Sequence, residues 1–532
     1  MLALVALFTM QACDEDEILE EIPSDFLNSD VVLVDKAGFE SALTALHVGV
    51  RDGIYLSDGF PNYYAMHIGT DVATTGVEGL PQFRDYNITL TPFFGTVDFF
   101  WNWAYLSVFP RANTIIEAAE NPDVVWESEA EKNAVIAEAR FMRGYANNVM
   151  ANIFGGIPIV DRVETAPRLD YVRNTREEVL QFAKEDLIFA SQWLPETTEI
   201  DGRIVKGAAD HLLSEVYISL GEYTNAIASA TDVIDSGLYN LMTTRFGSAA
   251  NEPGDVFSDL FKDNNQNRSS GNMESIWVIQ IEFQTPGGEP GAGGNNWLRR
   301  WGPRYWALRD PDGNPGMILA SPFGRGVAQV RPNSYSLFTI WQSDFDNDIR
   351  NSEFNIRRTW FYNNPESNFF GQEVIYDPAT SGIDSLRFYP SFTKIEGEAL
   401  AGANRGRTFT DYMIMRLAET YLLRAEAHLL NGNPTAAADD INIVRARANA
   451  TPVSAGEVDI DYILDERARE LMVEEPRRRT LVRMGRLVDR VREYNIRQDT
   501  RETIQDFHRW FPIPQSAIDA NIGAELEQNP GY

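Results

Sequence analysis

The sequence has a single cysteine, few lysines and no long apolar segment in its body. Because Cys13 has no second cysteine to pair with, the 532-residue chain has neither an internal disulfide nor a cysteine-based metal site. After Cys13, no segment approaches the ~18 consecutive apolar residues that a membrane-spanning helix needs. Six lysines stand against 40 arginines, and the net charge is −32. So acidic a chain argues against a nucleic-acid partner and against direct adhesion to anionic lipid.

The cysteine lies where a bacterial lipoprotein signal would end. A short apolar stretch leads into Cys13, and the acidic run Asp14-Glu-Asp-Glu17 follows at once. Such a signal is removed and the new N-terminal cysteine is acylated, so we expect residues 1–12 to be a signal peptide. Several acyl chains, at ~0.8 kcal/mol per buried methylene, would give lasting anchorage, with residues 13–35 as an acidic tether. The alternative is a buried N-terminal helix with an incidental thiol.

Helical periodicity dominates two parts of the chain, which we interpret as a scaffold over residues 36–245 and 406–532. The clearest helical patterns cover residues 130–153, 175–194, 206–220, 223–236, 412–431 and 435–447. Two successive pairs of these helices have the small and aromatic spacing of a tetratricopeptide hairpin, with turns at Gly221 and Gly432. Repeats of this kind usually support binding and rarely perform chemistry. Ordinary helical core packing is the alternative.

Between residues 246 and 405 the helical periodicity is lost. Glycine, proline, asparagine and aromatic residues are frequent there, and six of the 11 tryptophans lie in this part. The alternating run Ser275–Ile281 predicts a short strand. We therefore expect a mostly α-helical protein with one domain over residues 36–532, in which an irregular, loop-rich excursion with short strands carries the function.

Five blocks of the sequence match one known family in order. They are Glu138-Ala-Arg-Phe-Met-Arg143 with Phe154-Gly-Gly-Ile-Pro158, Lys206-Gly-Ala-Ala209 through Gly237-x-Tyr239, Met415-Arg-Leu-Ala-Glu-Thr-Tyr421 through Arg445, Ile463-Leu-x-Glu-Arg467 with Glu470-Leu471, and Pro512-Ile-Pro514 with Gln528-Asn-Pro-Gly-Tyr532. On these blocks and on Cys13, the chain resembles the SusD/RagB family of outer-membrane nutrient-binding lipoproteins of Bacteroidota. The chain departs from the family pattern at Gly144-Tyr145, Glu475-Pro476 and Thr480, which concern scaffold packing.

The resemblance implies a fold and a function. The fold would be a tetratricopeptide-like helical scaffold that carries an irregular ligand-binding excursion. The protein would be anchored in the outer membrane by lipid on Cys13, exposed at the cell surface, and placed as a lid on a SusC-like TonB-dependent β-barrel transporter. It would capture an oligosaccharide, or sometimes a peptide, and deliver it unaltered, without a cofactor. The alternatives are a secreted glycoside hydrolase or lyase, which needs two carboxylates ~5–9.5 Å apart, and a scaffold that binds only protein.

The best candidate ligand site is the loop of residues 293–306. A sugar site needs exposed flat aromatic rings beside hydrogen-bonding groups, and glycines would let the loop approach the ligand closely. The rings offered are Trp297, Trp301, Tyr305 and Trp306, and the polar groups are Asn295, Asn296, Arg299, Arg300 and Arg304. The alternative is that these rings pack the excursion onto the scaffold, as most tryptophans do.

A second candidate is the loop of residues 77–94, which contains Phe83, Arg84 and Tyr86. Trp101 and Trp103 follow, but their close helical spacing favours a place in the core.

Arginine is unexpectedly frequent next to the first candidate loop. Residues 297–331 contain six arginines and two aspartates in an otherwise acidic chain. Because guanidinium groups grip carboxylate or sulfate in a bidentate way, we hypothesise an anionic glycan as ligand. The alternative, slightly favoured by the sequence, is that arginine serves neutral sugars through hydrogen bonds and simply replaces lysine in this chain.

Few patterns point to chemistry. The five histidines are scattered and lack metal-ligand spacing, and there is no glycine-rich phosphate loop or nucleophile elbow. The triplet Asp344-x-Asp346-x-Asp348 hints at calcium, but Ile349 and Asn355 stand where a calcium loop of the EF-hand type needs glycine and glutamate. We therefore predict neither a metal site nor an enzyme.

Overall fold

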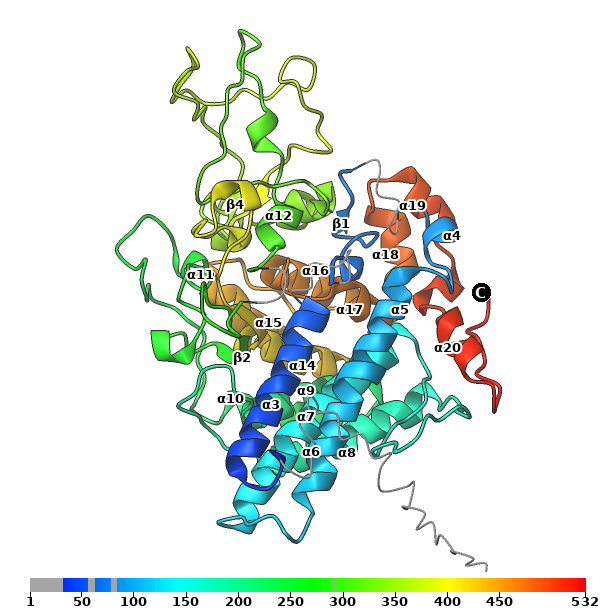
Figure 1. Cartoon of the computed structure of the whole chain (residues 1–532). Helices are drawn as coiled ribbons and strands as arrows, with labels where there is room; N and C mark the ends of the chain where they lie inside the picture. The colour runs from blue at the N-terminus through cyan, green and yellow to red at the C-terminus, as the bar shows by residue number, and fades with distance from the viewer. Residues whose placement is uncertain (1–31, 56–62, 78–83, 290–292) are drawn as a thin grey trace, which may run out of the picture.

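The computed structural model describes residues 32–532 apart from 56–62, 78–83 and 290–292. The predicted signal peptide, Cys13 and the tether up to residue 31 lie outside these residues, as does Phe83. Figure 1 shows a body of packed helices from which a lobe, drawn in light green to yellow, projects at the top. In the described part of the chain, no helix has both the length and the apolar character needed to cross a membrane.

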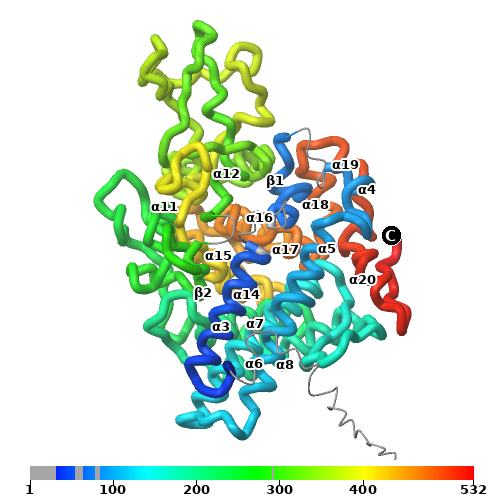
Figure 2. The backbone as a smooth tube through the Cα atoms, in the orientation of Figure 1, coloured from blue at the N-terminus to red at the C-terminus, as the bar shows by residue number. Residues whose placement is uncertain are grey.

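The body is built from the N-terminal helices and the C-terminal third of the chain. Its helices before the excursion are α3 (Lys36–Val50), α4 (Tyr86–Thr89), α5 (Gly95–Asn102), α6 (Phe109–Ala119), α7 (Glu129–Ile153), α8 (Arg176–Trp193), α9 (Lys206–Ser219) and α10 (Tyr223–Ile234). After the excursion follow α14 (Leu417–Leu430), α15 (Pro434–Arg447), α16 (Ile460–Leu471), α17 (Arg477–Arg483), α18 (Leu487–Tyr494), α19 (Gln498–Thr503) and α20 (Gln515–Ala520). Figure 2 shows the last of these, in orange and red, beside the blue α4 and α5. The mostly helical fold is confirmed.

Side-chain caps explain where the long helices begin. Thr175 accepts a hydrogen bond from the backbone N–H of Glu178 at 3.2 Å, and the Glu178 carboxylate accepts one from the Thr175 N–H at 2.7 Å. Ser128 caps α7 in the same way by accepting from the Glu131 N–H. Each cap satisfies backbone donors that a helix leaves unpaired, so these starts are visible in the sequence.

The two predicted hairpins are present and lie against each other. Helix α9 packs on α10, α14 packs on α15, and α10 also packs on α14. Ala226 and Ala230 on α10 and Ala418 and Ala425 on α14 are fully buried, so small side chains let these helices approach closely.

One predicted helix is wrong at its start. Residues Tyr412–Arg416 form strand β6, which pairs antiparallel with β2 (Ser275–Ile279), so that Tyr412 lies opposite Ile279 and Arg416 opposite Ser275. Helix α14 begins only at Leu417. The pairing partner lies more than 130 residues earlier in the chain, and local periodicity cannot reveal such a contact.

Most of the excursion lies between β2 and β6 in the chain. It contains α11 (Val256–Asp259), α12 (Trp297–Trp301), α13 (Ser334–Leu337), β3 (Arg331–Pro332), β4 (Ile356–Arg357) and β5 (Ser391–Phe392). Strand β3 pairs with β1 (Ala73–Thr74), and β4 pairs with β5. The projecting lobe has a small core of its own, made by Tyr305, Leu308, Met317, Trp360, Tyr362, Val374, Ile383 and Phe388. This core holds the lobe in shape independently of the main core.

A buried ion network lies beneath the β2–β6 pair. The Glu470 carboxylate is 2.9 Å from Arg350 Nη1 and 2.5 Å from Arg416 Nη1, and it also pairs with Arg447. Arg350 also binds Glu466 at 2.8 Å. All five side chains are almost fully enclosed, so each charge depends on its partners for compensation.

The acidic triplet that hinted at calcium belongs to the same network. Asp348 pairs with Arg350 at 2.6 Å, and Asp344 pairs with Arg445 at 2.6 Å while accepting a hydrogen bond from the Thr451 N–H. Arginines therefore hold two of its three carboxylates. Among the described residues, no three His, Cys, Asp or Glu side chains gather as a metal site requires.

Candidate functional site

Three of the four rings predicted to bind ligand in the loop of residues 293–306 are part of the protein core. Trp297, Trp301 and Tyr305 are 4%, 2% and 1% exposed. The Trp301 ring meets His67 edge to face at 5.1 Å, and Tyr305 stacks on Trp360 at 5.1 Å between ring centres. These three rings therefore lack the exposed face that the prediction required, because the protein encloses them.

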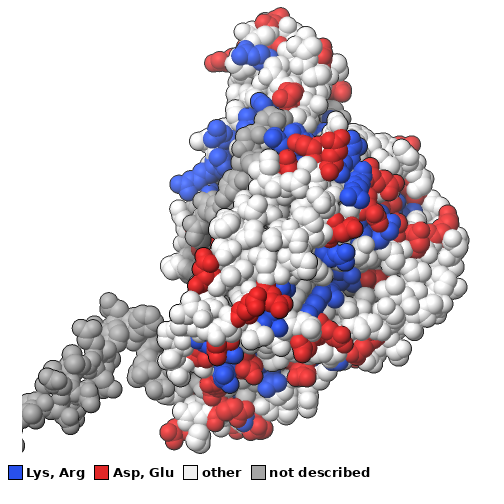
Figure 3. Space-filling model, turned by 90° about the vertical axis from the view of Figure 1, so that its right-hand side faces the viewer, with Lys and Arg blue, Asp and Glu red and all other residues white. Residues whose placement is uncertain are grey.

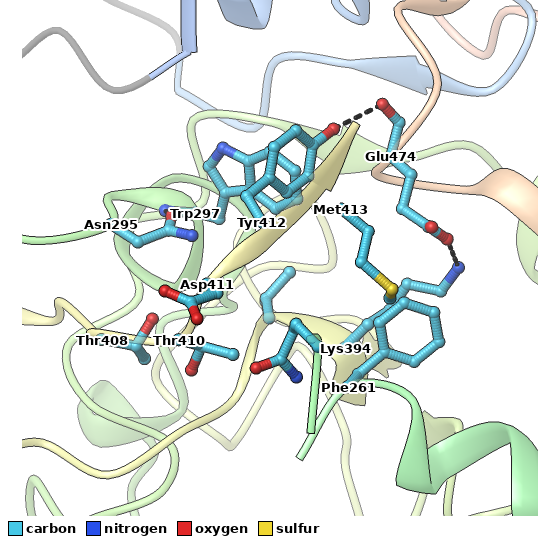
Figure 4. A pocket seen from close by; sticks show the side chains of 12 residues that line it. Phe261, Asn295, Trp297, Lys394, Thr408, Thr410, Asp411, Tyr412, Met413 and Glu474 are labelled. Atoms are coloured by element: carbon cyan, nitrogen blue, oxygen red, sulfur yellow. Dashed lines mark hydrogen bonds and ion pairs between the residues drawn. The ribbon is translucent and has the colours of Figure 1, made fainter. Parts of the chain in front are cut away.

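Trp297 faces a small internal cavity, drawn in Figure 4. The cavity has a volume of about 20 Å³, enough for a water molecule but far below the size of a sugar. The Lys394 ammonium lies 2.5 Å from the Glu474 carboxylate, and Tyr412 donates to the Glu474 carbonyl at 2.6 Å. Burial raises the pKa of Asp411 to about 6 and lowers the pKa of Lys394 to about 8. This cavity is a structural feature of the β2–β6 region.

Two further predicted groups are also buried. Asn296 is 1% exposed, and its neighbour Asn295 uses its side-chain oxygen to accept from the Trp297 N–H at 2.9 Å. Tyr86 is fully buried, where its hydroxyl donates to the Gly69 carbonyl at 2.7 Å and accepts from Arg478. The prediction that Asn296 and Tyr86 contact a ligand at the surface is therefore wrong.

Glycines outside the loop, at positions 326 and 406, bring other backbone segments close to it, whereas the sequence led us to expect loop glycines that approach a ligand. A side chain at Gly326 would meet the Gly302 carbonyl carbon and oxygen at 2.4 Å. One at Gly406, which has a positive φ of 63°, would meet the backbone of Arg325 at 2.6 Å. Only glycine fits both positions, and the result is that α12, the segment around Arg325 and the segment around residue 405 converge.

Trp306, the fourth ring of the loop, is partly exposed. Its indole N–H donates to the Gly326 carbonyl at 2.8 Å, which fixes the orientation of the ring. The Arg325 guanidinium lies over that ring at 5.2 Å from its centre. A flat aromatic surface held rigidly beside a planar donor is suited to stacking on a sugar and hydrogen-bonding its hydroxyls.

The three arginines predicted to bind ligand in this loop are all partly exposed. Arg299 donates from Nη1 to the Arg405 carbonyl at 3.2 Å. Arg300 binds the side-chain oxygen of Gln329 and lies over the Tyr64 ring at 5.7 Å. Arg304 donates from Nε to the Val327 carbonyl at 3.3 Å.

Arg304, Arg325 and Arg387 form what we call the arginine cluster. The backbone N–H of Arg304 donates to the backbone carbonyl of Arg387 at 2.8 Å, which joins the segments that carry these two arginines. Burial lowers the pKa of Arg304, and the nearby charges of Arg387 and Arg325 lower it further. Figure 3 shows Lys and Arg gathered at the upper left of the face in view, below the projecting lobe, and Lys and Arg mixed with Asp and Glu over the rest.

A larger hollow than the cavity at Trp297 lies elsewhere, between the α5–α6 region and α20. It is a groove of about 500 Å³ with a mainly apolar lining. Trp101 stacks on Tyr105 at 4.6 Å, and the Arg168 guanidinium lies over the Tyr171 ring at 4.7 Å. Trp101 and Trp103 are 7% and 3% exposed, which confirms their predicted place in the core.

Comparison with known proteins decides the family. A profile described as "SusD family" matches residues 341–532, and one described as "Starch-binding associating with outer membrane" matches residues 70–218. The SusD-like protein P2 of Formosa agariphila is 24% identical over 99% of this chain and 98% of its own length. The chain belongs to the SusD family.

Other SusD relatives agree with this assignment. The starch-binding protein SusD of Bacteroides thetaiotaomicron is 36% identical over a shorter stretch, 23% of this chain and 22% of its own. A solved structure named as a laminarin-binding SusD-like protein superimposes with a TM-score of 0.67, at 21% identity, over 94% of this chain and 100% of the other. The SusD-like fold predicted from the five sequence blocks is confirmed.

Within this SusD fold, sequence reasoning missed part of the candidate site. Arg387 and Arg405 lie far along the chain from the loop of residues 293–306, and no local pattern connects them to it. Arg325 lies inside the arginine-rich stretch of residues 297–331, which was the available signal. The stacked rings of the groove were not predicted as a site either.

Proposed function

We propose that this SusD-family protein is a cell-surface glycan-binding lipoprotein that captures an oligosaccharide and passes it to a SusC-like TonB-dependent transporter. Binding alone is required, with no bond made or broken in the ligand. The family supports this proposal, since one relative is named as starch-binding and a structural neighbour as laminarin-binding. Acylation of Cys13 would hold the protein at the outer membrane, where a lid on the transporter must lie.

The observation that carries the proposal is the partly exposed Trp306 ring, fixed by its hydrogen bond to Gly326 and flanked by Arg304 and Arg325. Sugars have apolar C–H faces that stack on such rings and hydroxyls that accept hydrogen bonds from guanidinium groups. We place the ligand across this surface, where the lobe meets the body.

Trp306→Ala is expected to weaken binding of the cognate oligosaccharide by about 10- to 100-fold, because burial of one such ring contributes ~1.5–3 kcal/mol. Calorimetry of the purified full chain against a panel of neutral and acidic oligosaccharides measures this effect. Trp193→Ala is the matched control, since Trp193 is also a half-buried tryptophan but lies at the end of α8. The control variant should bind as the wild type does.

The groove next to α20 is the competing location for the ligand site. Tyr171→Ala removes a ring of that groove without touching the Trp306 surface. If Tyr171→Ala abolishes binding while Trp306→Ala leaves it intact, the site lies in the groove and our placement is wrong. If no member of the panel binds to the wild type, the glycan proposal gives way to peptide cargo.

Delivery to a transporter is tested separately. We expect the acylated protein to co-purify from outer membranes with a large β-barrel protein, and Cys13→Ser to abolish its membrane retention. A Cys13→Ser variant that stays in the membrane fraction would contradict the lipid anchor.

A further inference from the structure

The arginine cluster differs from the buried arginines of the helical body, which are neutralised by carboxylates. In the body, Arg477 and Arg490 share Asp71 at 2.6 and 2.8 Å, and Arg483 binds Glu426 at 2.7 Å. The chain has 78 acidic residues for 46 basic ones, so a carboxylate is available to most arginines. A group of neighbouring arginines with few carboxylate partners therefore suggests that an anionic ligand supplies the missing negative charge.

The three arginines of the cluster have one carboxylate between them. Among the described residues, neither Arg304 nor Arg325 has a carboxylate within 4.0 Å. Arg387 lies 3.5 Å from Asp384, and both of these side chains are well exposed to water. Exposed pairs of this kind contribute little, so most of the positive charge is uncompensated.

The two acidic residues that follow Arg304 most closely in the sequence are engaged elsewhere. Asp310 accepts a hydrogen bond from the Ser367 hydroxyl at 2.6 Å and from backbone N–H groups of its own turn. Asp312 accepts from the Asn368 side chain at 3.0 Å. Both carboxylates stabilise the far end of the lobe and do not pair with the arginine cluster.

A fourth arginine, Arg331, hydrogen-bonds the segment that carries Arg387. Arg331 is 9% exposed and donates to the Pro332 carbonyl at 2.7 Å and the Ser385 carbonyl at 3.3 Å, with its guanidinium 5.7 Å from the centre of the Tyr389 ring. Its hydrogen bonds go to neutral carbonyls, so its charge also remains. Burial is the main cause of the lowered pKa of Arg304; repulsion from Arg387 and Arg325 adds to it, and attraction to Asp384 opposes it.

We propose that the arginine cluster binds the carboxylate or sulfate groups of an anionic oligosaccharide whose sugar ring stacks on Trp306. The inference rests on the proposed function and specifies its ligand class. An anion placed among Arg304, Arg325 and Arg387 relieves their mutual repulsion and accepts charge-assisted hydrogen bonds in the bidentate geometry that guanidinium groups favour. Such bonds are about twice as strong as neutral ones, so the acid group contributes to selectivity as well as to affinity.

Two matched pairs of probes test this inference on the purified full chain. One pair is an oligomer of uronic acid and the same oligomer with its carboxyls methyl-esterified, and the other is a sulfated galactan oligomer and its desulfated form. We expect at least one acidic form to bind about tenfold or more tightly than its neutral counterpart. This preference should fall between low salt and about 0.5 M NaCl, because salt screens exposed charges. The two pairs also tell carboxylate from sulfate.

Substitutions in the arginine cluster test whether the preference for the acidic probe arises there. Arg304→Gln and Arg325→Gln should each weaken binding of the acidic probe by about tenfold and leave binding of the neutral probe unchanged. Arg325→Lys, which keeps the charge but loses the planar donor, should lie between the two. Arg111→Gln on α6 is the matched control, since Arg111 is exposed and hydrogen-bonds Ser107 without a carboxylate partner among the described residues. Thermal unfolding of each variant checks that it folds.

Each outcome decides the matter. Equal binding of the acidic and neutral probes, lost in Trp306→Ala, overturns the charge inference and leaves the proposed function intact. No binding of either acidic probe overturns the inference as well. The proposed function itself fails only if the neutral oligosaccharides of the wider panel also show no binding that depends on Trp306.

Discussion

Glu470→Gln is expected to lower the free energy of unfolding by about 3–5 kcal/mol, the largest effect of any single charge removal that we predict. Glu470 is completely buried and pairs with Arg350, Arg416 and Arg447. Glutamine keeps the shape of the side chain but leaves three enclosed guanidinium groups short of one negative charge. Equilibrium unfolding in urea measures the difference.

A surface carboxylate provides the matched control. Asp170 pairs with Arg168 at 3.0 Å, but its side chain is 65% exposed. Water already solvates both of these charges, so Asp170→Asn should change the free energy of unfolding by no more than about 1 kcal/mol. If both variants lose the same small amount, the buried network does not stabilise the fold in the way we describe.

The same buried ion network makes the stability of the fold depend on pH. Burial alone would raise the pKa of Glu470, but Arg447, Arg416 and Arg350 outweigh it and hold that pKa well below its ordinary value. The pKa of Glu466 is likewise lowered to about 2, against burial, by Arg350, Arg469 and Arg445. A carboxylate with a lowered pKa stabilises the fold above its unfolded-state pKa of about 4.3 and loses this contribution as the pH falls through the folded-state value. The wild type should therefore lose stability below about pH 4.5, and Glu470→Gln should lose less over the same range.

Trp301→Ala is expected to destabilise the protein by about 3–5 kcal/mol, because it removes a large buried ring and leaves a cavity that its neighbours cannot fill. The ring is 2% exposed, and His67 packs against it. Any loss of glycan binding in this variant should follow the loss of folded protein. Thermal unfolding and calorimetry on the same sample separate these two effects.

Trp306→Ala is the informative counterpart in the same loop. Trp306 is partly exposed, so its removal should cost less than about 1.5 kcal/mol of stability while it weakens binding strongly. A Trp301→Ala protein that unfolds like the wild type but no longer binds sugar would return Trp301 to the ligand site and refute its place in the core.

These two tryptophans show how far the sequence could predict the site. The sequence pointed to the loop, the arginine-rich stretch and Trp306, which make up the site that we propose, because composition is a local property. It could not tell which rings would be exposed, since Trp301 is covered by His67 and Tyr305 by Trp360, both distant in the chain. Ion pairing has the same limit: Arg304 and Arg416 look alike in sequence, and only the fold places Glu470 beside Arg416.

The helices could be predicted because the signals that start and end them are local. Caps such as Thr175 with Glu178 and turns such as Gly221 act within a few residues, so α8, α9 and α10 begin and end close to the predicted positions. The error at Tyr412–Arg416 arose where the structure depends on a remote partner, strand β2.

That pairing of β2 with β6 has an evolutionary consequence. The segment between β2 and β6 leaves and re-enters the body on adjacent strands, so its two ends lie side by side whatever its length. The entropy of closing such an insertion rises only by about 0.6 kcal/mol for each doubling of its length. Descendants of one ancestor can therefore lengthen, shorten or exchange the segment between β2 and β6 without disturbing the helices beneath. A chimera that carries a relative's segment between Ile279 and Tyr412 should inherit that relative's choice of sugar on an unchanged framework.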